Sequence, residues 1–265
     1  MTISVYHSNT HIKIEVIPAF DDNYIWAIYH ENGTKVAIVD PGDATVVLQF
    51  LEKNCVELSD ILLTHHHADH IGGVPELLEH YPKCRVFGPS NENISSINKR
   101  LHGEGRFKIG QYSVSVLDIP GHTKGHIGYM VGDNLFCGDT LFSAGCGRVF
   151  DGTILDLFHS ISQLLALPAQ TKVYCAHEYT LANLQFAMHV EPLNIKIKEH
   201  NAKIANKIKN GGRSIPTSIE QEKLINPFFK FESEEIKAFV SESLGQTNLT
   251  PELIFSHLRE LKDNF

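Results

Sequence analysis

The chain lacks an excess of positive charge, a long apolar run and any C-x-x-C pair. Each absence argues against a class of protein. Lysine and arginine number 23 against 31 aspartate and glutamate residues, which gives a net charge of −8. Nucleic-acid-binding surfaces are usually basic, so this balance argues against a nucleic-acid partner. No run approaches the roughly 18 apolar residues of a membrane span. Met1–Thr10 has no basic segment followed by an apolar one, so we expect neither a signal peptide nor a membrane partner.

Cysteine is sparse, and its spacing suggests no disulfide framework. The five residues are odd in number and lie at Cys55, Cys84, Cys137, Cys146 and Cys175. A chain of 265 residues buries a sizeable core without disulfides. We therefore predict reduced, mostly buried thiols in a cytoplasmic protein. A cysteine nucleophile is the alternative interpretation.

The first two-thirds of the chain alternates between short strands and a few helices. Runs rich in Val, Ile, Tyr and Phe predict strands at Ile12–Ile17, Tyr24–Tyr29, Lys35–Val39, Ile61–Leu63, Arg85–Phe87, Ser113–Leu117, Ile127–Val131, Leu135–Cys137 and Lys172–Cys175. Apolar residues at helical spacing predict helices at Asp43–Asn54, Val74–His80 and Leu155–Leu167, the first of them capped by Asp43.

After about residue 178 the strand-like runs vanish. Helices are predicted at Leu181–Val190, Ile195–Lys209, Ser233–Ser243 and Pro251–Leu261. We place a boundary near His177, which gives a mixed domain over residues 1–177 and a helical domain over residues 178–265.

Histidine is abundant, with 16 residues, and four of them lie in the run Thr64-His65-His66-His67-Ala68-Asp69-His70. Transition metals take neutral imidazole and carboxylate as ligands. The His-x-His-x-Asp-His spacing can turn alternate side chains toward two neighbouring points, so one motif could serve two metal ions. A solvated histidine-rich loop is the alternative. An expression tag would lie at a terminus and lack the aspartate.

Three further strand ends each deliver a candidate ligand. His122 follows Pro120-Gly121, Asp139 follows Gly138, and His177 follows Lys172–Cys175. Loops at the ends of several strands are a common way for a rigid sheet to build a site. Taken singly, each of these turns is as well explained by side chains that cap backbone groups.

The set THHHADH, PGHTKGH, FCGDT and AHEYT resembles the metallo-β-lactamase superfamily, and more narrowly the bacterial type of glyoxalase II, the hydroxyacylglutathione hydrolases. The resemblance runs nearly end to end. It includes DDNYIW at Asp21–Trp26, DPGDA at Asp40–Ala44, LFSAGCGR at Leu141–Arg148, NPFF at Asn226–Phe229 and RELKDNF at Arg259–Phe265. It implies an α+β fold, a four-layer αββα metallo-β-lactamase sandwich, with a smaller C-terminal all-helical domain that binds glutathione.

The resemblance also implies two divalent metal ions, with zinc as the first choice and iron or manganese as alternatives. The first ion would be held by His65, His67 and His122, and the second by Asp69, His70 and His177. Asp139 would bridge both ions, and Asp69 and Asp139 would serve catalysis. His66 and His126 match no ligand position. His66 is expected to point away from the metals in a supporting role, and His126 to pack or form a hydrogen bond near the site. The remaining histidines expected at the surface include His80, His102, His159 and His200.

The substrate-binding residues that the resemblance implies are Arg148, Phe150, Tyr179, Arg259 and Lys262. Eukaryotic members often have tyrosine at the position of Phe150, so we expect that hydroxyl's hydrogen bond to the substrate to be absent or supplied by another group. Without the resemblance, Arg259 and Lys262 would be interpreted as a cationic end of the last helix.

The implied activity is hydrolysis of S-(2-hydroxyacyl)glutathione thioesters, typically S-D-lactoylglutathione to D-lactate and glutathione. This reaction is the second step of methylglyoxal detoxification, and its nucleophile would be a hydroxide shared by two metal ions. We expect a cytoplasmic monomer that acts on this small molecule.

Four other functions fit parts of the pattern. A β-lactamase would share the superfamily motif, but the cytoplasmic character and Asp69 argue against it. A sulfur dioxygenase with one iron is the rival from another class, although such proteins typically lack the long helical tail. A nuclease would want a basic surface, and a non-catalytic metal-binding protein would not need a cationic substrate clamp.

Overall fold

The computed structural model describes residues 12–103 and 105–265, so Met1–Thr10, where we expect no signal peptide, lies outside the described part. The described chain packs as two compact units. Unit 1 holds the residues up to Asp118 together with Gly125–Gly138, and unit 2 holds Ile119–Lys124 and Asp139–Phe265. The domain boundary that we place near residue 177 stays a prediction.

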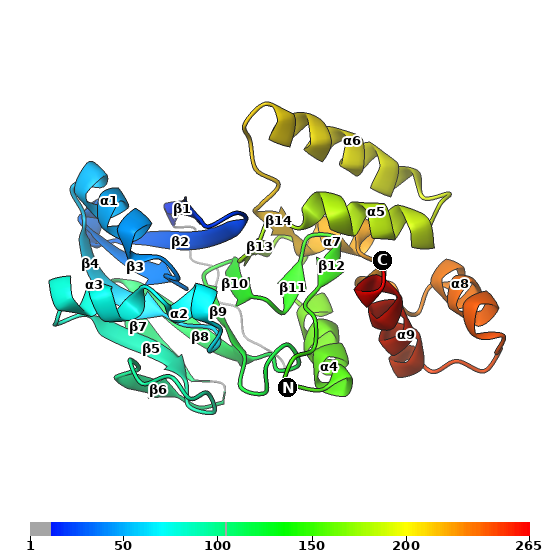
Figure 1. The fold of residues 1–265 in the computed structure, drawn as a ribbon, viewed down its shortest axis with the longest axis horizontal. Coiled ribbons are helices and arrows are strands. Elements are labelled where there is room, and N and C mark those ends of the chain that lie inside the picture. Colours follow the sequence, from blue (N-terminus) through cyan, green and yellow to red (C-terminus); the bar gives the residue numbers. More distant parts are fainter. Residues whose placement is uncertain (1–11, 104) are drawn as a thin grey trace. The chain divides into compact units, whose positions relative to one another are not determined.

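A mixed six-stranded sheet forms one side of the core of unit 1 (Figure 1). Its strands, in spatial order, are β1 (Ile14–Ala19), β2 (Asn23–His30), β3 (Lys35–Val39), β4 (Glu57–Leu62), β5 (Arg85–Pro89) and β6 (Lys99–Leu101). The first three strands pair antiparallel and the last four pair parallel. Parallel neighbours need a crossover connection. Helices α1 (Ala44–Asn54) and α3 (Val74–His80) supply two of these connections and bury apolar side chains in the same cluster as the sheet.

Four more strands of unit 1 form an antiparallel meander. They are β7 (Arg106–Ile109), β8 (Tyr112–Asp118), β9 (Ile127–Val131) and β10 (Asn134–Gly138). Two short helical segments complete the unit, namely η1 (Glu31–Gly33) and α2 (Ala68–Ile71). The phenol of Tyr129 on β9 is fully buried and donates a hydrogen bond to the carbonyl of Leu63 at 2.6 Å. This bond ties the meander to the residue that ends the apolar run before the histidine cluster.

Unit 2 is mainly helical. Its helices are α4 (Ile154–Leu165), α5 (Thr180–Val190), α6 (Ile195–Lys209), α7 (Ile219–Ile225), η2 (Pro227–Phe229), α8 (Glu234–Leu244) and α9 (Pro251–Asp263). Its strands are β11 (Leu141–Phe142), β12 (Gly145–Cys146), β13 (Lys172–Cys175) and β14 (Thr217–Ser218). Among the described residues, no helix combines the length and the apolar character that crossing a membrane would require.

A buried carboxylate organises the short β11–β12 ribbon of unit 2. Glu222 on α7 accepts hydrogen bonds from the Ser143 hydroxyl at 2.9 Å, the Ala144 amide at 2.7 Å and the Thr217 hydroxyl at 2.7 Å. The Asn226 side chain donates to Glu222 at 3.0 Å and to the carbonyl of Gly145 at 3.0 Å. Burial raises the pKa of Glu222 above its usual value, and the four donors work against that rise. The network holds the backbone that leads to Arg148.

All predicted strands and helices are present in the structure, with ends that differ by a few residues. The bounds of Lys35–Val39, Ile127–Val131 and Lys172–Cys175 agree, and the side chain of Asp43 accepts from the Thr45 amide at 2.8 Å as the predicted cap. One prediction is wrong. Strand structure does not end at residue 178, because β14 pairs antiparallel with β13.

Candidate metal centre

The histidine cluster begins where β4 ends. Thr64, His65 and His70 are buried, whereas His67 and Asp69 are half-buried. His67 keeps an extended backbone as the residue that precedes α2, so the helix begins inside the motif and carries Asp69 and His70. The helical turn therefore carries two of the four candidate ligands, Asp69 and His70. The non-helical segment before it carries the other two, His65 and His67.

Asp40, just after β3, contacts two residues of this cluster through its carboxylate. Its carboxylate accepts hydrogen bonds from the Thr64 amide at 2.8 Å and the Thr64 hydroxyl at 2.7 Å, and it lies 3.0 Å from Nδ1 of His70. The Thr64 hydroxyl also lies 3.0 Å from Nδ1 of His65. Gly42 is required nearby, since a Cβ there would lie 1.8 Å from the carbonyl oxygen of Asp69. The DPGDA segment thus supports the cluster, although no local sequence pattern pairs Asp40 with His70.

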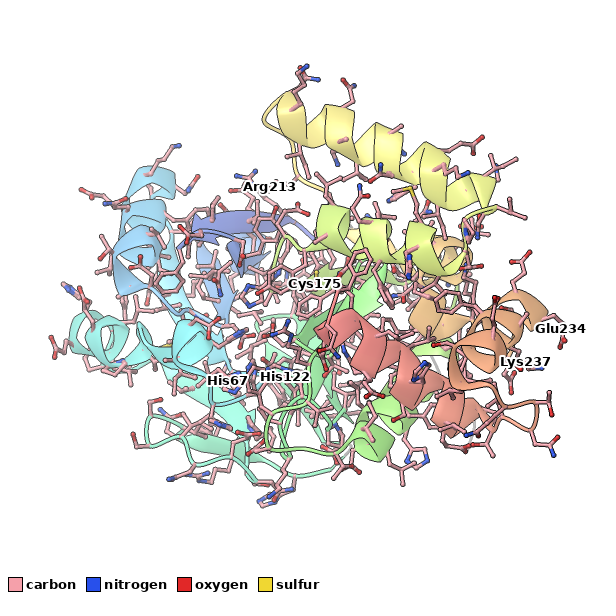
Figure 2. All side chains as sticks on the ribbon, turned by 45° about the vertical axis from the view of Figure 1, so that its right-hand side comes forward. His67, His122, Cys175, Arg213, Glu234 and Lys237 are labelled. Atoms are coloured by element: carbon pink, nitrogen blue, oxygen red, sulfur yellow. The ribbon has the colours of Figure 1, made fainter. Side chains whose placement is uncertain are left out.

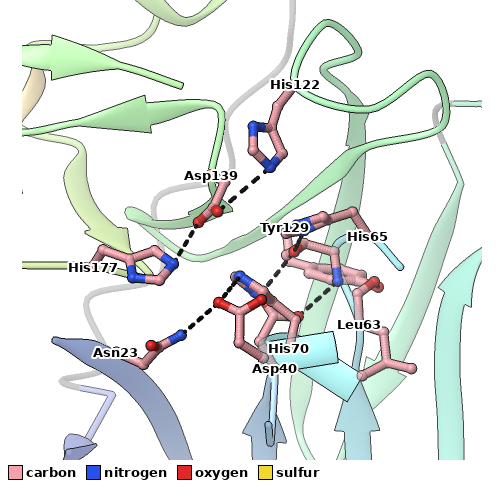
Figure 3. Close-up of polar contacts among 11 residues, drawn as sticks. Asn23, Asp40, Leu63, His65, His70, His122, Tyr129, Asp139 and His177 are labelled. Atoms are coloured by element: carbon pink, nitrogen blue, oxygen red, sulfur yellow. Dashed lines mark hydrogen bonds and ion pairs between the residues drawn. The ribbon is translucent and has the colours of Figure 1, made fainter. Parts of the chain in front are cut away.

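Asp139 lies between two histidines in unit 2 (Figure 3). Its Oδ2 atom is 3.5 Å from Nε2 of His122, and its Oδ1 atom is 3.4 Å from Nε2 of His177. The opposite ring nitrogen of His122 donates to the carbonyl of Arg148 at 2.8 Å. Each carboxylate oxygen therefore faces a different imidazole, which is the arrangement that a bridging ligand needs.

Two groups of histidine and aspartate side chains lie close enough to hold a metal ion. Within each group, one ligand atom from every residue lies within 4.8 Å of the others. The first group is His65, His67, His122 and Asp139, and the second is Asp69, His70 and His177. These are the residues that the resemblance implied, and their roles as ligands stay a prediction.

The donor atoms fit a transition metal. Nδ1 of His65, His70 and His122 is engaged by Thr64, Asp40 and the Arg148 carbonyl, so each ring offers Nε2. Metal-binding histidines characteristically use the second nitrogen in this way, which fixes the ring orientation and the tautomer. Imidazole and carboxylate donors suit zinc, iron and manganese alike.

Other polar contacts support the cluster. The Asn23 amide, at the start of β2, donates to Oδ2 of Asp69 at 2.9 Å (Figure 3). His126 is buried and stacks on His65 with ring centroids 4.7 Å apart. Nδ1 of His66 donates to the Glu92 carboxylate, and the His66 ring packs edge-on against His67 with centroids 5.0 Å apart. Packing and hydrogen bonding near the site, expected for His66 and His126, are therefore observed.

The four histidines expected at the surface differ in exposure. His80, His102 and His159 are exposed. His200 on α6 is half-buried, and burial lowers its pKa below the usual 6.5, so it is a partly covered surface group.

The cationic residues of the predicted clamp gather around Asp263 in unit 2. Arg148 is exposed and lies 3.3 Å from the Asp263 carboxylate, whereas Arg259 is buried and donates to it at 3.0 Å. Arg259 also donates to the carbonyl of Cys146 at 2.8 Å. Burial lowers the pKa of the Lys262 ammonium, and the charges of Arg259 and Arg148 lower it further. A carboxylate ligand would relieve this repulsion.

The two aromatic residues predicted to meet the substrate lie beside candidate metal ligands. The ring of Tyr179 stacks on His177 with centroids 4.8 Å apart and planes within 6°. Phe150 is 64 % exposed, and its ring centroid lies 5.1 Å from that of His122. Both side chains retain enough exposure for contact with a ligand.

The cysteines are free thiols, and four of the five are buried, as predicted. Burial raises the pKa of Cys146 to about 11 and that of Cys84 to about 12. The thiolate is the nucleophilic form. These values therefore count against the alternative of a cysteine nucleophile at these positions.

The comparisons with known proteins agree with this architecture. Residues 20–92 match the model of the metallo-beta-lactamase superfamily, and residues 178–265 match the model "Hydroxyacylglutathione hydrolase C-terminus". The fold is that of the superfamily, with two mixed sheets and a helical C-terminal region. It is similar to the crystal structure of the BLEG-1 B3 metallo-beta-lactamase, with a TM-score of 0.63 and 24% identity over 82% of this chain and 99% of that one. The structure of ETHE1 from Myxococcus xanthus gives a TM-score of 0.64 and 25% identity over 96% and 98% of the two chains.

Fold and metal-ligand clusters thus define a member of the metallo-β-lactamase superfamily. Curated relatives narrow the assignment. The hydroxyacylglutathione hydrolase of Aliivibrio salmonicida is 48% identical over 96% of this chain and 100% of its own length. That of Shewanella baltica is 46% identical and that of Photobacterium profundum 44%, each with the same coverage. The chain belongs to the hydroxyacylglutathione hydrolase family, whose members are metal-dependent hydrolases.

Proposed function

We propose that the chain hydrolyses S-(2-hydroxyacyl)glutathione thioesters, with S-D-lactoylglutathione as the typical substrate, at a centre of two divalent metal ions. The observation that carries the proposal is the placement of Asp139, with one carboxylate oxygen toward His122 and the other toward His177. His65, His67 and His122 would hold the first ion, and Asp69, His70 and His177 the second. Zinc is the expected metal, with iron or manganese as alternatives.

The bound ions would polarise a carbonyl oxygen and ionise a water molecule at neutral pH. The chain's own residues set the geometry for this chemistry. Asn23 holds the carboxylate of Asp69 in one orientation through a 2.9 Å hydrogen bond, and Asp40 holds the ring of His70. Asp69, which is half-exposed, would accept a proton from the attacking water. The leaving thiol has a pKa near 8.5, so no strong general acid is required.

Residues of unit 2 would bind the glutathione part of the substrate. Glutathione carries carboxylates, and Arg148 and Lys262 supply the opposite charge. Arg259 adds charge from a buried position, where it also fixes Asp263 and the Cys146 backbone. Tyr179 would donate a hydrogen bond to the peptide, and Phe150 would offer only an apolar contact. Residues 178–265 would then form the substrate-binding domain of a cytoplasmic monomer.

The decisive experiment follows loss of the thioester bond of S-D-lactoylglutathione with purified protein. Turnover should disappear on chelation and return when Zn²⁺, Fe²⁺ or Mn²⁺ is added back. Absence of turnover in a sample with two metal ions per chain, verified by elemental analysis, would refute the proposal. Oxygen consumption with glutathione persulfide would then identify the dioxygenase alternative.

A further inference from the structure

Glu92 is a buried acid that the proposed chemistry does not use. It lies in the turn after β5, and its side chain is only 2% exposed. Its Oε2 atom accepts a hydrogen bond from Nδ1 of His66, and its Oε1 atom accepts one from the backbone amide of Gly125 at 3.0 Å. A buried carboxylate is costly unless its oxygens are satisfied. Each oxygen of Glu92 meets a donor from a different loop.

One loop carries candidate metal ligands, and the other carries a ring that stacks on one of them. His66 stands between His65 and His67, the two histidines that the motif contributes to the first group. Gly125 precedes His126, whose ring stacks on His65 at a centroid distance of 4.7 Å and an angle of 23°. One carboxylate therefore holds the side chain of His66, which stands between two candidate ligands, and the backbone just before the ring that stacks on His65.

The side chain of Glu92 approaches the backbone of Gly125 closely. A Cβ at Gly125 would lie 2.8 Å from Cγ and 2.9 Å from Oε1 of Glu92, so only glycine allows this close approach. Arg100 on β6 donates to the carbonyls of Glu92 at 3.4 Å and Ile94 at 3.3 Å, which fixes the turn that carries the acid. The hydrogen bonds from Arg100 and from the Gly125 amide thus fix the turn and the Gly125 loop relative to each other.

We propose that Glu92 is a positioning residue for the first metal ion. Its carboxylate turns the backbone at His66 so that the imidazoles of His65 and His67 face one point, and it fixes His126 against His65. The inference rests on the ligand assignment of the proposed function. It adds a residue that touches neither substrate nor metal and acts only through the orientation of the ligands.

Two substitutions test this role from different sides. Glu92→Gln removes the charge and replaces one acceptor oxygen by an amide NH₂, which either opposes the Gly125 amide or obliges Nδ1 of His66 to accept, while size and shape are kept. Glu92→Asp keeps the charge but is one methylene too short to reach both partners. Partners of this kind typically account for 10- to 100-fold in metal affinity. We expect Glu92→Gln to release metal about 10- to 100-fold faster to a chelator, and Glu92→Asp to fall between it and the wild type.

The measurement uses purified holoprotein challenged with a chromophoric chelator, so metal release is followed without any turnover. Glu79→Gln, at an exposed position on α3, is the matched control and should release metal at the wild-type rate. In cobalt-substituted protein, the d–d absorption bands of Glu92→Gln should shift, because the ligand geometry changes. A purely structural acid would lower the unfolding temperature of the metal-free protein and leave these bands unchanged.

Gly125→Ala gives an independent test, because the added methyl group would displace the Glu92 side chain without removing any charge. It should also accelerate metal release and shift the cobalt bands. Wild-type release rates and wild-type bands in both Glu92→Gln and Gly125→Ala would overturn the proposal. Thioester turnover is scored separately on the wild type, so failure of the proposed activity leaves this comparison of metal release intact.

Discussion

The carboxylate of Asp40 lies 3.0 Å from Nδ1 of His70, and the same Oδ2 atom accepts the Thr64 hydroxyl at 2.7 Å. Through Thr64, which contacts Nδ1 of His65 at 3.0 Å, Asp40 reaches the other candidate metal group as well. His65 belongs to the first group and His70 to the second. One buried acid therefore orients a ligand in each group.

Asp40→Asn should weaken metal binding at both positions. The amide keeps the shape of the side chain, but it cannot accept hydrogen bonds with both of its terminal atoms. We expect metal affinity to fall by about 10- to 100-fold, as is usual when the partner of a ligating histidine is changed. Chelator competition monitored by elemental analysis measures the effect.

Asp43→Asn is the matched control for this substitution. Asp43 caps α1 through the Thr45 amide, and asparagine is an equally good N-cap. The control should therefore bind metal like the wild type. Equal metal affinity in Asp40→Asn and Asp43→Asn would show that Asp40 does not orient the ligands.

Local pattern was sufficient to predict the longer buried strands of the fold, but not the short buried strands β11 and β12. Lys35–Val39 and Ile127–Val131 are dense in β-branched residues and end at turn residues, so their bounds follow from the sequence. β6 escaped prediction because Lys99-Arg100-Leu101 is polar and lies at the sheet edge, where packing no longer requires apolar side chains. Such a strand forms because it pairs with a strand distant in the sequence, and a short stretch of sequence does not show that pairing.

The candidate ligands were accessible from the sequence, whereas the residues that support them were not. The histidine cluster is evident from composition, and the positions of His122, Asp139 and His177 at strand ends made them candidates. The family resemblance implied which metal ion each of them would hold. Asp40 and Asn23 lie 30 and 46 residues from the side chains that they hold. An isolated aspartate or asparagine in a turn has many ordinary explanations. Only the folded chain reveals which of them face the cluster.

Lys262→Ala should impair substrate binding more than the chemical step. Lys262 carries an ammonium that is half-buried beside Arg148 and Arg259, where a carboxylate of glutathione would be attracted. Loss of one charge-assisted hydrogen bond is expected to raise KM about 10-fold at low salt, with little change in kcat. Steady-state kinetics with S-D-lactoylglutathione at two ionic strengths measures it.

A matched control for Lys262→Ala is Lys237→Ala. Lys237 on α8 forms an i,i+3 ion pair with Glu234 at 3.0 Å (Figure 2). Exposed pairs of this kind contribute little, so this variant should keep the wild-type KM. A kcat loss without a KM change in Lys262→Ala would contradict a binding role.

Phe150→Tyr should strengthen binding of the substrate. Phe150 is 64 % exposed and adjoins His122, so a phenol hydroxyl can be added without crowding the core. One new hydrogen bond of about 0.5–1.5 kcal/mol corresponds to a fall in KM of about 2- to 10-fold. Phe150→Leu, which lacks both ring and hydroxyl, provides the comparison, and the same KM for all three proteins would exclude a substrate contact at this position.

His30→Gln should change how the stability of unit 1 depends on pH. His30 is buried at the end of β2, where its Nε2 atom lies 2.8 Å from the Ser59 hydroxyl. Burial lowers its pKa below the usual 6.5, although the nearby Asp60 acts in the opposite direction. The unfolded chain therefore takes up a proton at a higher pH than the folded one. Stability from the neutral ring is fully present above pH 6.5 and is lost as pH falls through the folded pKa.

Urea unfolding of the metal-free protein between pH 8 and pH 5 tests the direction of this pH dependence. Over the window between the two pKa values, the free energy of unfolding of the wild type should decrease by up to about 1.4 kcal/mol per pH unit more than that of His30→Gln. Metal-free protein is used because protonation of ligand histidines would otherwise add its own pH dependence. Parallel curves for the two proteins would mean that His30 titrates alike in the folded and unfolded chains. A steeper loss in the variant would reverse the direction argued from its burial.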